Sequence, residues 1–152
     1  MSAGDVLIVD DNAVNIRVVA EILQGAGYRV RAATSGPRAL DVVRAGRPEL
    51  ILLDIQMPEM DGFQVCERLK GAPETAPIPV LFLSGHDDAA ERGRAFEVGA
   101  ADYMAKPVEP AEVLARVSAH LQASRLSREV DRLREELRQL RARVAACPDC
   151  GR

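Results

Sequence analysis

Acidic, hydroxyl and basic side chains occur where apolar runs of the sequence end. Asp10 and Asp11 close one run, Asp54 closes another, Ser84 ends a third, and Lys106 follows a fourth. If these runs are parallel strands, the side chains meet at one edge of a sheet, and three carboxylates there would repel one another unless a cation neutralised them. Oxygen ligands without a nearby His or Cys suit Mg²⁺. The pattern therefore predicts a magnesium site at this edge.

The lysine at position 106 adds to this prediction. The chain has 20 Lys and Arg residues, and only Lys70 and Lys106 are lysines, so arginine would be the ordinary choice at a basic position. A lysine ammonium is a compact point charge on a flexible stem, whereas a guanidinium is a planar fork. We expect Lys106 to contact a carboxylate and then a phosphoryl oxygen, with the Ser84 hydroxyl as a further donor.

Five short apolar runs alternate with five segments of helical periodicity. The runs occupy residues 6–10, 28–33, 50–54, 78–84 and 101–105. Between them apolar residues recur three and four positions apart, and Gly or Pro marks the joints. Uninterrupted apolar runs are typical of strands covered on both faces. The sequence predicts the α/β class, with a five-stranded parallel, doubly wound (flavodoxin-like) sheet and five helices, whose ligands bind at the carboxyl ends of the strands.

The order and spacing of four motifs resemble the receiver domain of two-component response regulators. The motifs are VDDN at 9–12, LLDIQMPEMDG at 52–62, LSG at 83–85 and AKP at 105–107. Each motif alone is weak, but four in register on five βα units form a strong signal. The resemblance covers residues 5 to about 121, and it implies phosphoryl transfer from a histidine kinase or phosphotransfer protein.

The resemblance also implies a role for each acidic position. Asp54 matches the phosphoacceptor, and Asp10 and Asp11 match the acidic pair that organises Mg²⁺. The main-chain carbonyl of Gln56 matches the third protein ligand of the metal. The family is not enzymatic beyond gaining and losing a phosphoryl group at the aspartate, which is the activity expected here.

Three further positions match the family's response to phosphate. Ser84 and Tyr103 match the hydroxyl and aromatic pair that reorients on phosphorylation. Lys106 matches the phosphate-contacting lysine, which is followed in the family by a proline with a typically cis peptide bond. The role of Tyr103 depends on the resemblance alone, since a half-buried strand aromatic would give the same pattern.

The fifth helix is expected to continue well past the domain, because no Gly or Pro occurs between Pro110 and Pro148. Its second half carries three heptads, with apolar residues at a and d: Leu126, Val130, Leu133, Leu137, Leu140 and Val144. β-Branched residues at a with Leu at d favour a two-stranded coiled coil.

The charged residues beside this apolar seam indicate a direction. Glu129 and Glu136 lie at g, and Arg134 and Arg141 lie at e, so each acid meets the partner's arginine in a parallel pair. We expect a parallel homodimer through residues 126–144. The helix has no continuous basic face, so direct contact with nucleic acid is not expected.

The expected organisation is a receiver domain at 1–121, a coiled-coil helix at 122–146 and a Cys-x-x-Cys tail at 147–152. Cys147 and Cys150 resemble half of a zinc site, but two thiolates do not complete a tetrahedral shell. The tail is interpreted as the start of a module that continues beyond Arg152. The alternative, in which a parallel dimer contributes two pairs, stays open, as does zinc binding itself.

Composition narrows the remaining classes of protein. The 152 residues are 47% hydrophobic and 28% charged with a formal charge of −3, typical of one soluble domain with a short appendage. No apolar stretch is long enough to cross a membrane and no signal peptide is present, so a cytoplasmic protein without a membrane segment is expected. Nucleotide-binding glycine motifs are absent after the first run.

Two alternatives to the receiver stay open. One is a magnesium-dependent aspartyl-phosphate phosphohydrolase, which would need an Asp-x-Asp pair after the first run. The other is a phosphorylation-independent dimerisation module.

Overall fold

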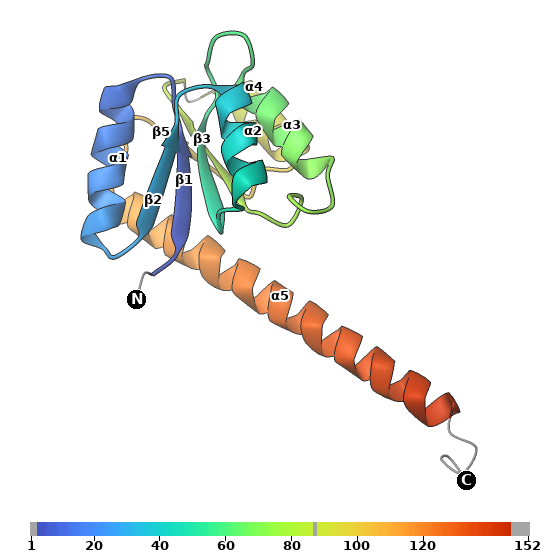
Figure 1. Ribbon diagram of the computed structural model, residues 1–152. Helices are drawn as coiled ribbons and strands as arrows, with labels where there is room; N and C mark the ends of the chain where they lie inside the picture. Colours follow the sequence, from blue (N-terminus) through green and yellow to red (C-terminus); the bar gives the residue numbers. More distant parts are fainter. Residues whose placement is uncertain (1–2, 87, 147–152) are drawn as a thin grey trace. The chain divides into compact units, whose positions relative to one another are not determined.

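Five parallel strands form one sheet in the computed structural model, which describes residues 3–86 and 88–146. The strands are β1 (Asp5–Val9), β2 (Arg29–Ala33), β3 (Leu50–Asp54), β4 (Val80–Ser84) and β5 (Asp102–Ala105). They lie in the order β2-β1-β3-β4-β5, and β2, β1 and β3 are seen side by side in Figure 1. The predicted α/β class and the alternation of strands and helices are confirmed, and the strand ends differ from those of the predicted runs by two residues at most, within the usual uncertainty of element boundaries.

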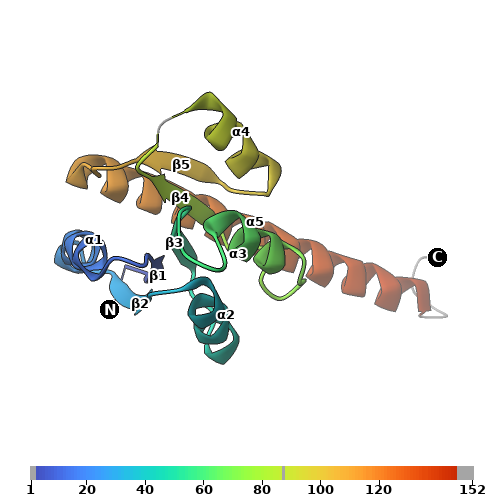
Figure 2. The same cartoon turned by 90° about the horizontal axis from the view of Figure 1, so that it is seen from above.

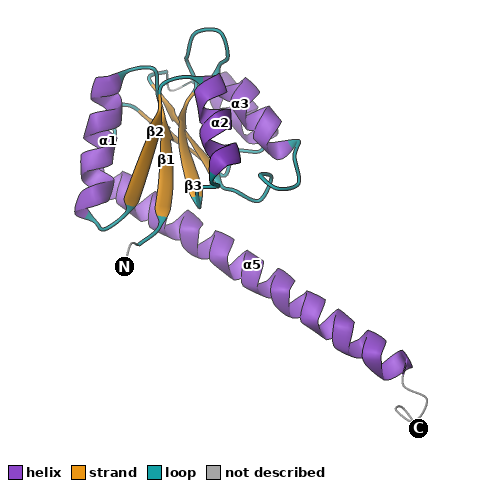
Figure 3. Ribbon diagram, in the orientation of Figure 1, coloured by secondary structure: helices purple, strands orange, loops and turns teal. Residues whose placement is uncertain are grey.

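A helix follows each strand, and Figure 3 colours the helices purple and the strands orange. The helices are α1 (Ala13–Gly25), α2 (Gly36–Ala45), α3 (Gly62–Lys70), α4 (Ala89–Glu97) and α5 (Pro110–Ala146). The first four each begin after a side chain that accepts hydrogen bonds from free main-chain N–H groups of the first turn: Asn12, Ser35, Asp61 and Asp88. Because Asn12 caps α1, neither Asp10 nor Asp11 is needed as the N-cap.

Helices cover both faces of the sheet (Figure 2). On one face, alternate strand residues such as Ile8 and Leu52 pack against α1 and the first part of α5. On the other face, the intervening residues such as Leu53 and Phe82 pack against α2, α3 and α4. The strands β3 and β4 are buried along their whole length, which explains their unbroken apolar sequence. Because helices pack on both faces of these strands, the strand ends that carry the polar side chains are held in position.

Two reactive side chains away from those strand ends serve the packing of α3. The Nζ of Lys70 donates hydrogen bonds of 2.8 Å to the carbonyls of both Ala76 and Ile78, and burial lowers its pKa. Cys66 is fully buried, and burial raises the pKa of its thiol to about 11. A thiol with so high a pKa is almost entirely protonated near neutral pH and reacts slowly.

The helix α5 is one continuous helix of 37 residues. The chain divides into two compact units, Met1–Leu121 and Gln122–Arg152, and the boundary falls within α5. In the described part of the second unit, all six apolar heptad residues are 44% to 67% exposed. No helix of the described residues is long and apolar enough to cross a membrane. Cys147 and Cys150 lie outside the described residues.

Candidate functional site

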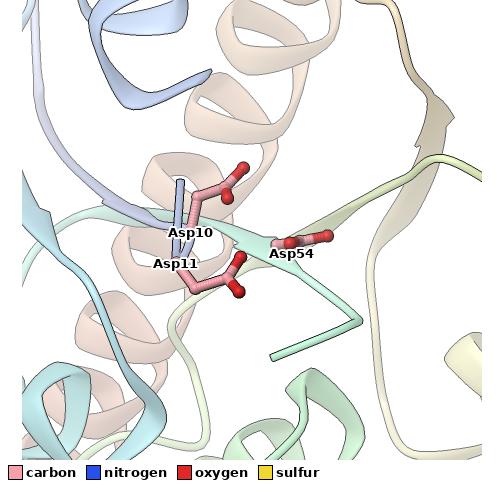
Figure 4. Close-up of side chains that lie close together, drawn as sticks. All are labelled: Asp10, Asp11 and Asp54. Atoms are coloured by element: carbon pink, nitrogen blue, oxygen red, sulfur yellow. The ribbon is translucent and has the colours of Figure 1, made fainter. Parts of the chain in front are cut away.

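Three carboxylates meet at the carboxyl ends of neighbouring strands. Asp10 and Asp11 directly follow β1, and Asp54 is the last residue of β3, which pairs with β1. One oxygen from each of the three side chains lies within 4.8 Å of the others, and the side chains extend toward the same space (Figure 4). Asp10 and Asp54 are buried, whereas Asp11 is exposed, so the cluster opens to solvent on the Asp11 side.

Lys106 joins two of these carboxylates. It follows β5, and its Nζ lies 2.9 Å from Asp10 Oδ2 and 3.2 Å from Asp54 Oδ1. The Lys106–Pro107 peptide bond is cis. The lysine side chain is 21% exposed, so its ammonium group faces the buried carboxylates from the margin of the site. Charge-assisted contacts of this kind are among the strongest hydrogen bonds in proteins.

The electrostatic balance of the site leaves excess negative charge. Burial raises the pKa of Asp54, Lys106 opposes this rise, and the neighbouring Asp10 and Asp11 add to it. Burial alone would lower the pKa of Lys106, but its contacts with Asp10 and Asp54 outweigh burial and raise it. One ammonium therefore faces three carboxylates, and a further positive charge would stabilise the ionised form of Asp54.

The donor set fits Mg²⁺. The candidate ligands are carboxylate oxygens, one of them on the exposed residue Asp11, which leaves room for the waters that Mg²⁺ retains. A depression beside the cluster is lined by Asp11, Gln56 and Asp61 among others, so Gln56 lies at the same margin. Asp10, Asp11 and Asp54 are the carboxylates that would hold the ion, and the family resemblance adds the main-chain carbonyl of Gln56.

Ser84 and Tyr103 lie on the adjacent strands β4 and β5. Ser84 ends β4 beside the last residues of β3, and Tyr103 is the second residue of β5. Both residues are buried: Ser84 is 1% exposed and Tyr103 is 5% exposed. Their hydroxyl groups do not bond to the carboxylates of the cluster; both instead contact the carbonyl of His86 and the side chain of Glu91.

Sequence reasoning missed two residues that shape this region. Glu91 lies in the first turn of α4, three residues after the N-cap Asp88, which is the spacing of a helix-capping pair and gave no sign of a site. Gly62 begins α3, and a Cβ atom there would lie 2.4 Å from the main-chain oxygen of Asp54. The Asp-Gly pair at 61–62 could have suggested such a close approach, since only glycine lacks the atom that would collide.

Comparison with known proteins assigns the chain to one family. Residues 6–118 match the model of the response regulator receiver domain, so the chain belongs to that family. Over 130 residues it is 38% identical to the response regulator PleD of Caulobacter vibrioides, covering 86% of this chain and 28% of that protein. Over 125 residues it is 42% identical to a probable cyclic di-GMP phosphodiesterase of Vibrio cholerae, covering 82% of this chain and again 28% of the relative.

A solved structure shows the same arrangement. The crystal structure of a putative response regulator from Chloroflexus aurantiacus matches with a TM-score of 0.76 and 38% identity, covering 78% of this chain and 98% of the other. The predicted resemblance to receiver domains is therefore confirmed, as is the flavodoxin-like fold. The chain spans little more than a quarter of the length of the two curated relatives named above, whose further activities concern those proteins.

Proposed function

We propose that Asp54 accepts a phosphoryl group from a histidine kinase or phosphotransfer protein, in a reaction that needs Mg²⁺ held by Asp10, Asp11, Asp54 and the Gln56 carbonyl. The observation that carries this proposal is the cluster of three carboxylates within 4.8 Å, joined by the Lys106 ammonium. A partner of this kind also favours a cytoplasmic location. The resident activity is limited to gain and loss of the phosphoryl group at Asp54.

The chemistry follows from the charges at the strand ends. A carboxylate oxygen of Asp54 attacks the phosphorus of a phosphohistidine, an O–P bond forms, the P–N bond breaks, and the imidazole leaves. Bound Mg²⁺ would supply positive charge to the phosphoryl oxygens. Lys106 holds Asp54 in place before transfer, and its flexible stem lets the ammonium contact a phosphoryl oxygen afterwards. Most of the catalysis is positioning and charge neutralisation.

The test uses a small phosphodonor. With acetyl phosphate and Mg²⁺, the intact mass of the full chain should increase by one phosphoryl group, and the increase should be lost in Asp54→Asn and on addition of a chelator. Asp41→Asn is a suitable control, because Asp41 is exposed on α2 and pairs only at 3.6 Å with Arg44. Undiminished labelling of Asp54→Asn would refute the assignment.

The two acids after β1 should differ. The family resemblance makes Asp11 the direct metal ligand, and Asp10 is already engaged by Lys106 at 2.9 Å. Replacing Asp11 with Asn should therefore weaken Mg²⁺ binding more than the same change at Asp10. Calorimetric titration with Mg²⁺ measures the difference, and a larger loss in Asp10→Asn would reverse the roles.

We also propose that the second half of α5 forms a parallel homodimer that relays the state of the receiver to an output module. Its support is the row of six apolar heptad residues, all of them exposed in the single chain. Glu129 and Glu136 bond to Arg132 of the same helix, whereas Arg134 and Arg141 make no ion pair within the described residues. Exposed charge pairs contribute only about 0.2–1 kcal/mol each, so the apolar seam must supply most of the affinity.

Light scattering tests the dimer. The full chain should be dimeric at tens of micromolar, and truncation after Leu121 should make it largely monomeric. A full-length Leu133→Asp variant should act like the truncation, while Glu129→Gln should weaken the dimer only mildly. A monomeric full chain, or a truncated chain that dimerises equally well, would contradict the proposal. A chain that dimerises but cannot be labelled at Asp54 by acetyl phosphate and Mg²⁺ would favour the alternative of a phosphorylation-independent module.

Repeated turnover separates the receiver from the phosphohydrolase alternative. A receiver should release phosphate from Asp54 without acting on other phosphate esters. The sequence supports this, because two acids stand side by side at positions 10 and 11, where a phosphohydrolase of aspartyl-phosphate type would carry an Asp-x-Asp pair. Multiple-turnover hydrolysis of p-nitrophenyl phosphate would favour the alternative.

A further inference from the structure

A compact hydrogen-bond network links the last residue of β4 and the second residue of β5 to the first turn of α4. The hydroxyl of Ser84 contacts Oε1 of Glu91, and the hydroxyl of Tyr103 contacts the main-chain carbonyl of His86. Two longer contacts cross these, each of 3.0 Å: Tyr103 Oη to Glu91 Oε1, and Ser84 Oγ to the His86 carbonyl. The main-chain N–H of His86 donates to Ser84 Oγ at 3.0 Å.

Proton counting selects one arrangement of this network. A serine or tyrosine hydroxyl has a single proton to donate. The Ser84 proton is best placed toward the Glu91 carboxylate, because a bond to a charged acceptor is stronger than a bond to a neutral carbonyl. The Tyr103 proton is then free for the His86 carbonyl, its closer partner. In this arrangement the Ser84 hydroxyl donates away from Asp54.

The conformation of Glu91 is not the one its position in the helix would give. In α3 the N-cap Asp61 and the residue three positions later, Gln64, bond to each other's main-chain N–H groups, which is a complete capping box. In α4 the N-cap Asp88 accepts from the Glu91 N–H at 2.7 Å. The Glu91 carboxylate, however, contacts Ser84 and Tyr103, and it also lines the depression beside Asp11 and Gln56.

We propose that Glu91 is a positioning residue that holds the Ser84 hydroxyl away from Asp54 in the unphosphorylated protein, so that a phosphoryl group must displace it to gain the Ser84 hydrogen bond. This inference rests on the proposed phosphorylation of Asp54. Glu91 Oε1 also contacts the Tyr103 hydroxyl at 3.0 Å, but its closer contact is with the Ser84 hydroxyl, and the proposal concerns that bond. Glu91 thereby sets how readily the phosphorylated state forms.

The experiment measures binding of beryllium fluoride, a phosphoryl mimic, to the full chain in the presence of Mg²⁺ by calorimetry. Glu91→Ala should bind the mimic about fivefold more tightly than the unchanged protein. In the variant, the unphosphorylated state loses the charge-assisted bond from Ser84 to Glu91 and keeps only a neutral bond from Ser84 to the His86 carbonyl, whereas the state with bound mimic loses nothing. Glu91→Gln keeps an acceptor oxygen but not the charge, so its affinity should lie between those of Glu91→Ala and the unchanged protein. Glu97→Ala, at an exposed position of the same helix, should change nothing.

Repeating the Glu91→Ala change in the Ser84→Ala variant separates an effect of Glu91 through Ser84 from a general effect of its charge. In Ser84→Ala there is no hydroxyl to hold, so adding Glu91→Ala should leave the affinity for the mimic unchanged. An equal gain in both backgrounds would mean that Glu91 acts by repelling the mimic, and would overturn the proposal. Unchanged or weaker binding by Glu91→Ala alone would overturn it too, while the proposed function stood.

Stability measurements of the metal-free protein provide the readout that is independent of phosphate chemistry. Urea unfolding of Ser84→Ala, Glu91→Ala and the double variant should show that the two single losses are not additive. Additive losses would mean that no bond joins the two side chains, and would overturn the proposal. If the unchanged protein and all variants fail to bind the mimic, the proposed function fails, and the regulatory role of Glu91 fails with it.

Discussion

Replacing Asp54 with Asn should stabilise the metal-free protein, although Asp54 is the proposed phosphoacceptor. Its carboxylate oxygen lies within 4.8 Å of oxygens of Asp10 and Asp11 and 3.2 Å from the Lys106 ammonium. At an effective dielectric constant of about 20, like charges at the first distance repel by about 3.5 kcal/mol or more per pair, and opposite charges at the second attract by about 5 kcal/mol. The attraction to Lys106 offsets the two repulsions, so burial is the main cost of the charge, and it raises the pKa of Asp54.

The expected gain in the free energy of unfolding is about 1–3 kcal/mol near pH 7 in a chelator. Because the pKa of Asp54 is raised in the folded state, the stability that its protonated form contributes is present at low pH and lost as the pH rises through that raised pKa. The gain from Asp54→Asn should therefore be largest near neutral pH and shrink as the pH falls toward 4. Saturating Mg²⁺ should reduce it, because the metal stabilises the unchanged protein by binding the folded state.

Urea unfolding followed by circular dichroism measures these free energies. Asp41→Asn, on the exposed surface of α2, should differ little from the unchanged protein under all three conditions. If Asp54→Asn were equal to or less stable than the unchanged protein in a chelator near pH 7, the cost inferred for the charge on Asp54 would be wrong. A gain that Mg²⁺ left undiminished would argue against Asp54 as a metal ligand.

Three further changes test other parts of the structure. Lys106→Arg should keep the fold but slow acetyl phosphate labelling about tenfold or more, because a planar guanidinium does not reproduce a point charge; intact-mass time courses at the normal rate would refute this role. Gly62→Ala should cost about 1–3 kcal/mol in urea unfolding, since its Cβ would lie 2.4 Å from the Asp54 oxygen; unchanged stability would mean that the two segments separate easily. Burial would raise the pKa of Asp102, but hydrogen bonds from three neighbouring donors outweigh it and lower that pKa below 3.8. The stability from this group is present above pH 4 and lost as the pH falls through the lowered value, so Asp102→Asn should be destabilised at pH 7 and progressively less so toward pH 2.

The sequence was sufficient to predict the sheet and the meeting of its polar strand ends. Apolar runs in regular alternation with helical segments define a parallel sheet, and the carboxyl ends of parallel strands lie on one edge. The proximity of Asp10, Asp54 and Lys106 follows from this geometry, although 96 residues separate the first from the last. The periodicity predicted which residues end the strands, with an uncertainty of one or two positions.

The contacts of Glu91 could not be predicted in the same way. An acidic residue three positions after Asp88 is normally interpreted as a helix cap, and the choice between capping and reaching Ser84 depends on side-chain conformation and on the neighbouring strand. The approach of Gly62 to Asp54 likewise depends on how a loop folds back, which hydrophobic periodicity does not describe. Tertiary packing decides both.

Because the chain has only two lysines, their reaction with acylating reagents can report on the charge at the carboxyl ends of the strands. Acylating reagents need a neutral amine, and Asp10 and Asp54 raise the pKa of Lys106, so its ammonium should resist modification while both carboxylates are ionised. The Lys70 ammonium has a lowered pKa but donates to two carbonyls within the fold, so its reaction provides an internal reference. All other Lys and Arg positions are arginines, which such reagents leave unchanged. The ratio of acylation at residues 106 and 70, measured by peptide mass, would therefore follow the charge on Asp54 without a label or a substitution.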